Sequence, residues 1–139
     1  MPEGKLVFVE GADVETQVFD WGRLRWVSEP RVTAAERFSA GVVSLEPGKG
    51  HERHNHPGVE EVLYVLSGTG DQTVEVDDQI LKREVGPGVL IHIPPDVYHS
   101  TVNTGQEPMR LLAIYAPPGP EAELRAMEGV RIEPPERAS

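Results

Sequence analysis

The chain has 139 residues, which is enough for one domain but leaves no room for a second hydrophobic core. It contains no cysteine, so disulfides, thiolate metal sites and a cysteine nucleophile are excluded. The net charge of −10 opposes binding to nucleic acid and to anionic membrane surfaces, so we expect neither as a partner.

Short runs typical of β-strands follow one another along the chain, separated by glycine, proline or aspartate. Between two of them, Asp77-Asp78 predicts a tight hairpin turn. No pattern for a helix of three turns separates the runs, which argues against parallel βαβ units. We therefore expect an all-β fold, a closed antiparallel barrel or jelly roll, because closure removes exposed sheet edges. The expected strands cover residues 6–10, 23–28, 38–45, 60–66, 71–76, 79–85, 89–93, 99–103 and 109–116.

One short helix is expected near the C-terminus, outside the β-rich body. Pro120 suits a first helical turn, two glutamates follow it, and Gly129 ends the segment. The residues from 133 onward are typical of a loose tail. The expected organisation is a single domain over 1–139, with N-terminal strands in 5–28, a core in 38–116, and the helix and tail in 120–139.

The sequence contains no predicted membrane segment. No apolar run approaches the roughly 18 residues of a membrane span, and Met1–Lys5 does not open a signal peptide. We therefore expect a soluble, cytoplasmic protein.

Metal-ligating side chains are densest around His54, His56 and Glu61. Residues two apart in a strand point to the same face, so the two imidazoles could project side by side into a barrel. Glu61 shares its parity with the apolar residues 63 and 65, and a buried carboxylate needs a counter-charge that a divalent metal supplies. The alternative is that both histidines lie in a loop and that Glu60-Glu61 is a solvated pair.

The residues Gly48, His54, His56, Glu61 and Gly68 resemble, in type and spacing, the first motif of the cupin family. The four-residue gap after His56 leaves Glu60 as an alternative to Glu61, but the spacing to Gly68 favours Glu61.

Further along the chain, Gly88, Pro94, Asp96, His99 and Asn103 resemble the second cupin motif. Asp96 stands where the motif has glycine. Aspartate tolerates left-handed backbone conformations, so the turn should survive, and the substitution places an extra carboxylate near the loop before His99.

The resemblance implies a small antiparallel β-barrel, the double-stranded β-helix, that holds one divalent transition metal. The implied ligands are His54, His56, Glu61 and His99, and each is a residue able to bind metal. Such a set leaves coordination positions open on Mn, Fe, Zn or Ni, so the metal could be a Lewis acid or a redox centre.

The resemblance also implies a homodimer. The run Val62–Leu66 is apolar at both parities, and a strand that is apolar on both faces needs cover on both.

Other candidate residues are expected to have structural roles. We expect His51 in a solvent-exposed loop, with a place at the barrel mouth as the alternative, and His92 packed in a strand. Arg53 should face away from the metal. Arg23 and Arg37 could bind an anionic group of a substrate but suit the surface better. Expected core or subunit contacts are Trp21, Trp26 and Phe38, and Asn103 should bond the turn backbone.

The function expected from this set is that of a metal-dependent enzyme acting on a small, polar, oxygen-rich molecule. Its chemistry could be of the isomerase or lyase type or of the dioxygenase type. The alternative is a non-catalytic module that binds or senses a small molecule. A DNA-binding regulator is disfavoured because the chain is acidic and has no helix-turn-helix pattern.

Overall fold

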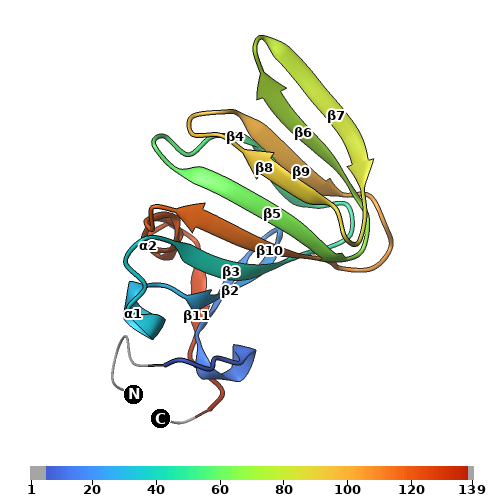
Figure 1. Ribbon diagram of the computed structural model, residues 1–139. Coiled ribbons are helices and arrows are strands. Elements are labelled where there is room, and N and C mark those ends of the chain that lie inside the picture. Colours follow the sequence, from blue (N-terminus) through green and yellow to red (C-terminus); the bar gives the residue numbers. More distant parts are fainter. Residues whose placement is uncertain (1–5, 138–139) are drawn as a thin grey trace.

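The computed structural model describes residues 6–137, which form two antiparallel β-sheets packed face to face (Figure 1). The larger sheet has seven strands in the order β11-β1-β2-β3-β10-β5-β8, and the smaller has four in the order β4-β9-β6-β7. The strands are β1 (Thr16–Phe19), β2 (Gly22–Ser28), β3 (Ser39–Leu45), β4 (Gly50–His54), β5 (Glu60–Ser67), β6 (Gly70–Val76), β7 (Gln79–Val85), β8 (Leu90–Ile93), β9 (His99–Asn103), β10 (Met109–Ala116) and β11 (Arg131–Glu133). This arrangement confirms the expected antiparallel jelly roll.

The core lies between the two sheets. Buried and less buried residues alternate along β3, β5 and β10, so one face of each strand points inward. Inward residues of the larger sheet, such as Val65 and Leu111, share one cluster with Val74 and Val85 of the smaller sheet. The predicted hairpin between β6 and β7 is confirmed, because Asp77 and Asp78 adopt φ angles of 51° and 63°, as the turn requires.

The described residues contain only short helices: the 3₁₀ turn η1 (Gly11–Asp13), α1 (Pro30–Thr33) and α2 (Pro120–Arg125). Within residues 6–137, none is long or apolar enough to cross a membrane. The predicted C-terminal helix begins at Pro120 as expected but ends before Gly129.

The expected strand at residues 6–10 is wrong. This segment is irregular, and Val7 and Phe8 are 84% and 92% exposed, so no neighbouring strand covers its apolar side chains. Residue 5, at the start of the expected N-terminal strands, and residues 138–139 of the expected tail lie outside the described residues.

Within the expected tail, residue 133 is the last residue of a strand, and residues 134–137 form neither a helix nor a strand. Arg131–Glu133 forms β11, which pairs with β1. Beyond it, Arg137 makes ion pairs with Glu10 and Asp13. Neither contact is local in sequence, which is why a pattern of neighbouring residues does not predict it.

Helix α2 packs against the sheets rather than lying outside them. Arg125 reaches Glu15 and Glu29 at 2.6 Å each, and Glu29 is only 2% exposed. Gln17 of β1 donates a hydrogen bond to the carbonyl oxygen of Glu121 at 3.3 Å. These contacts fix the helix beside one end of the barrel.

Candidate metal centre

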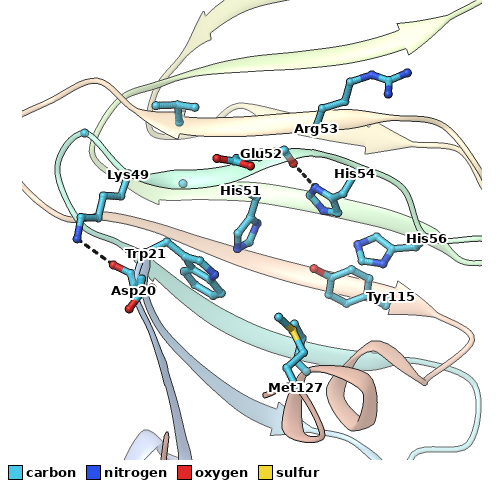
Figure 2. A pocket seen from close by; sticks show the side chains of 14 residues that line it. Asp20, Trp21, Lys49, His51, Glu52, Arg53, His54, His56, Tyr115 and Met127 are labelled. Carbon is cyan, nitrogen blue, oxygen red and sulfur yellow. Dashed lines mark hydrogen bonds between the residues drawn. The ribbon is translucent and has the colours of Figure 1, made fainter. Parts of the chain in front are cut away.

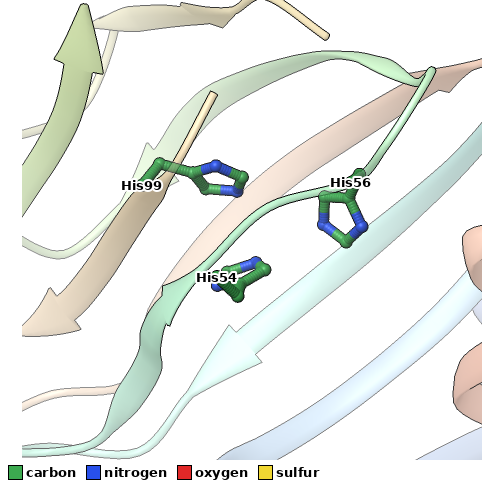
Figure 3. Close-up of side chains that lie close together, drawn as sticks. All are labelled: His54, His56 and His99. Atoms are coloured by element: carbon green, nitrogen blue, oxygen red, sulfur yellow. The ribbon is translucent and has the colours of Figure 1, made fainter. Parts of the chain in front are cut away.

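Three histidines converge inside one end of the barrel (Figure 3). One ring nitrogen from each of His54, His56 and His99 lies within 4.8 Å of the others. His54 ends β4, His56 follows in the next loop, and His99 begins β9 directly opposite His54. Nitrogens this close fit the separations that ligands have around one transition-metal ion.

The loop carrying His56 is held by the turn before β9. Asp96 adopts a φ angle of 70°, so this turn has the left-handed conformation expected when aspartate replaces glycine. Its carboxylate accepts a hydrogen bond from the Gly58 N–H at 2.9 Å, and its carbonyl oxygen accepts one from the Asn55 amide at 3.0 Å. Asp96 therefore anchors the His56 loop, and its carboxylate is engaged there.

Glu61 brings a buried carboxylate to the same place. Its side chain is 3% exposed, and its Oε1 lies 3.1 Å from Nε2 of His99 and 3.6 Å from Nε2 of His56. These three buried atoms have no hydrogen-bond partner within residues 6–137. Buried polar atoms are normally satisfied, and a single cation between them would satisfy all three. Glu60 instead faces outward and contacts His92 at 2.5 Å.

Backbone carbonyl groups orient two of the rings. Nδ1 of His54 lies 2.6 Å from the carbonyl oxygen of Glu52, and Nδ1 of His99 lies 3.0 Å from that of Val97. An Nδ1–H that donates to a carbonyl leaves Nε2 of the same ring free to bind a metal.

The charges of this group suit a cation. Burial lowers the pKa of His54 and of His56, which keeps both imidazoles neutral. Burial opposes ionisation of Glu61, but the neighbouring imidazoles outweigh it and hold the pKa of this carboxyl below its usual value. Burial also opposes protonation of His99, but Glu61 outweighs it and raises the pKa of the ring, so a proton and a metal compete for this site.

A pocket of about 790 Å³ leads from the surface to His54 and His56 (Figure 2). Its walls include the β1–β2 turn with Trp21, the strand β4, and Leu124 and Met127 from α2 and the segment after it. Tyr115 of β10 lies deep in the pocket, directly opposite Glu61 in the sheet. Burial and the charge of Glu61 raise the pKa of Tyr115 well above its usual value, so the phenol stays protonated.

His51 also lines the pocket, which corrects the expectation of an exposed loop residue. Residues 51 and 54 have opposite parity, so a regular strand would place them on opposite faces. The register between β4 and β9 shifts between them, and His51 pairs with Thr101 while His54 pairs with His99. Thr101 and His99 both face inward, so the bulge turns both histidines into the pocket.

The remaining expectations have mixed outcomes. Arg53 faces away from the histidines, as expected, and pairs with Glu75 at 2.6 Å. The expectation that His92 is packed in a strand is wrong, because its side chain is 51% exposed beside Glu60.

Among the aromatic residues, Trp26 is in the core, Trp21 lines the pocket and Phe38 is 41% exposed. Three positions have surface or turn roles: Arg23 and Arg37 are exposed outside the pocket lining, and the Asn103 amide bonds the backbone of Leu45 and Glu107.

We expect His51 to make the metal-free protein sensitive to acid. Burial lowers the pKa of His51 to about 4, from 6.5. Below pH 6.5 the unfolded chain takes up a proton that the folded protein does not, so stability is lost as the pH falls from 6.5 to 4. One pKa unit corresponds to about 1.4 kcal/mol, so the loss from this residue should be about 3 kcal/mol.

Urea unfolding in the presence of a chelator at pH 7 and pH 4.5 measures this loss. His51→Gln should lose less stability than the wild type over this range. An equal loss in both proteins would mean that His51 titrates normally.

Comparisons with known proteins identify the family of this chain and agree with its fold. The family model of the cupin domain matches residues 41–115, which is more than half of the chain. Protein SchB of Streptomyces halstedii is 34% identical over 103 residues, which are 74% of this chain and 72% of that protein.

Two further proteins resemble part or most of the chain. The glucose-6-phosphate isomerase of Thermococcus kodakarensis is 41% identical over 70 residues, which are 48% of this chain and 35% of the isomerase. This chain therefore matches about a third of that enzyme. The structure of KdgF from Halomonas sp. superposes with a TM-score of 0.71 over 85% of this chain and 99% of that one. Its sequence identity is 18%, so this similarity shows a shared fold.

Proposed function

Since this chain belongs to the cupin family, we propose that it is a metal-dependent enzyme acting on a small, oxygen-rich molecule. One observation carries the proposal. Three buried polar atoms, from His56, Glu61 and His99, have no hydrogen-bond partner within the described residues and face one another beside the part of the pocket that His54 and His56 line. A cation there would be both stabilised by the protein and accessible to a ligand.

The proposed ligands are His54, His56, Glu61 and His99, and the proposed cofactor is one divalent ion of Mn, Fe, Zn or Ni. When bound, such an ion would act as a Lewis acid or as a redox centre toward a chelating molecule. The chain supports this by keeping two imidazoles neutral and one carboxylate ionised. Next to the ligands, Tyr115 hydrogen-bonds the carboxylate of Glu61, so it can hold this ligand in position.

The reaction is proposed to be either an isomerase or lyase step, or a dioxygenase step. The first has support from the partial similarity to a glucose-6-phosphate isomerase. Metal analysis of protein purified from its own host narrows the choice. Turnover under strict anaerobiosis with zinc or manganese would exclude the dioxygenase, whereas oxygen uptake with iron would favour it. Ligand binding that is unchanged after chelation would instead favour a non-catalytic binding module.

We also propose that two copies form a homodimer through the outer face of the larger sheet. Leu90, Tyr64, Leu112 and Val42 lie directly opposite one another in turn across β8, β5, β10 and β3. Tyr64 is 39% and Leu90 is 56% exposed, and Leu112 and Val42 are half-buried, so the row forms a partly exposed apolar stripe. Burying such a stripe against its own copy would remove apolar surface from water.

Tyr64→Glu is expected to convert the dimer into a monomer, because it places two carboxylates in a buried interface. Sedimentation should give about twice the chain mass of 15.3 kDa for the wild type and the single mass for the variant. Ile80→Glu, at a 69% exposed position on β7 of the other sheet, should remain dimeric. A wild-type protein that sediments as a monomer contradicts the proposal.

A further inference from the structure

One wall of the pocket is apolar and is formed by residues other than the proposed metal ligands. Trp21, Leu124 and Met127 line it. Figure 2 shows Trp21 at one end of the pocket and His56 at the other, with Met127 projecting toward the space between them. A molecule bound at the histidines therefore extends along an apolar wall, which favours an apolar group on that molecule.

Trp21 is held in a fixed orientation. Its ring stacks on Phe19 with centroids 4.5 Å apart and an angle of 8° between the planes. His51 contacts Trp21 in an edge-on geometry at 4.3 Å between centroids. An aromatic side chain that is already ordered loses little conformational entropy when it contacts a ligand.

The opposite wall is fixed as well. Leu124 packs against the core, and the neighbouring Arg125 is clamped by Glu15 and Glu29. The space between Trp21 and the C-terminal segment is therefore set by the fold.

The cations at this pocket are engaged by the protein. Arg53 makes two hydrogen bonds to Glu75, at 2.6 and 3.0 Å, and points away from the pocket in Figure 2. Lys49 donates to the backbone carbonyl of Asp20 at 3.0 Å, and the side chains of Asp20 and Glu52 lie on the same rim. Within residues 6–137, the lining offers no cation without a protein partner to pair with a phosphate or a second carboxylate.

The remaining polar side chains of the pocket outside the proposed ligands include the imidazole of His51 and the phenol of Tyr115. No hydrogen bond to another described residue engages a ring nitrogen of His51, so its imidazole can hydrogen-bond an oxygen of a ligand.

We propose that the pocket selects a chelating molecule that carries a flat apolar ring and no negative charge beyond its metal-binding oxygens, with Trp21 as the residue that favours the ring. This rests on the proposed metal site and goes beyond it, because it names the class of ligand. The two chelating oxygens would face the histidines, and the ring would lie along Trp21, Leu124 and Met127.

Three probes that share one chelating group test the proposal. Catechol is the reference, 2,3-dihydroxynaphthalene adds a fused ring, and a sulfonated catechol adds an anion. Each is titrated by calorimetry into the zinc-loaded full chain and into the chelator-treated chain, with zinc measured afterwards to verify that it stays bound. We expect the naphthalene probe to bind roughly tenfold more tightly than catechol, from the added apolar area, and the sulfonate at least roughly tenfold more weakly.

Two variants test whether Trp21 and Met127 cause the preference for the fused ring. Trp21→Ala and Met127→Ala should each reduce the preference for the fused ring to less than about threefold. Phe38→Ala removes an aromatic side chain that is exposed outside the pocket lining, and it should keep the full preference. Met127 is 50% exposed, so its replacement does not threaten folding.

The possible results distinguish the proposed metal site from the proposed preference for an apolar ring. Equal binding of the three probes in the presence of zinc would overturn the ring selectivity and leave the metal site standing, as would tighter binding of the sulfonate. A preference that survives in both variants would overturn the role of Trp21 and the apolar wall. Binding that is the same with and without zinc would overturn the proposed metal site, and the inference with it.

Discussion

Replacing His99 by alanine is expected to remove most of the bound metal and, with it, any metal-dependent activity. The His99 ring is 2% exposed and lies 3.1 Å from Glu61, so no other described side chain can take its place without rebuilding the barrel interior. Changes to groups that only support a ligand cost about 10–100-fold in metal affinity, so loss of a ligand should cost at least that much. His54→Ala should behave in the same way.

Metal content per chain after dialysis, measured with activity, checks this prediction. His92→Ala is the matched control, because His92 is exposed and lies on the outer face of the sheet. The thermal midpoint of the His99 variant should fall by much less than the collapse seen when a zinc finger loses its metal, because the barrel has its own core. Full metal content in the variant would contradict the proposed ligand set.

Arg125→Ala is expected to destabilise the protein by about 3 kcal/mol, because it leaves Glu29 buried without a partner. Arg125 is the contact that ties α2 to Glu15 and Glu29, so the variant should also loosen the wall of the pocket. Trp21 lines that pocket whereas Trp26 is 1% exposed, so acrylamide quenching of tryptophan fluorescence should increase.

Urea unfolding measures the loss of stability. Arg131→Ala breaks a pair whose side chains are 67% and 39% exposed, and it should change stability by no more than about 0.5 kcal/mol. Adding Glu29→Gln to Arg125→Ala should recover part of the loss, because the unpaired charge is removed. If Arg125→Ala and Arg131→Ala lose equal stability, the ion pairs of Arg125 with Glu15 and Glu29 contribute no more to stability than an exposed pair does.

The positions of the candidate ligands could be predicted because they follow spacings within two short motifs. Glu61 faces inward by strand parity, and the turn at Asp96 keeps its backbone conformation despite the change from glycine. His51 could not be placed in this way. A register shift between His51 and His54 reverses the parity of the strand, and nothing local in the sequence marks a bulge.

The residues that form the pocket walls could not be predicted from local sequence patterns, for a different reason. Trp21, Leu124 and Met127 meet across about a hundred residues of chain, and only the packing of α2 against the barrel brings them together. The strand β11 is missed for the same reason, since its partner β1 lies near the other end of the chain.

The pairing of β11 with β1 has a consequence for biosynthesis. Because translation proceeds from the N-terminus, the residues that bear both motifs leave the ribosome before residues 120–137 do. The nascent barrel can therefore bring its histidines together while the edge of β1 is still unprotected and the C-terminal wall is still missing. Metal loading during translation would take place in a more open site, and the wall that Leu124 and Met127 form would be added only by the last part of the described chain.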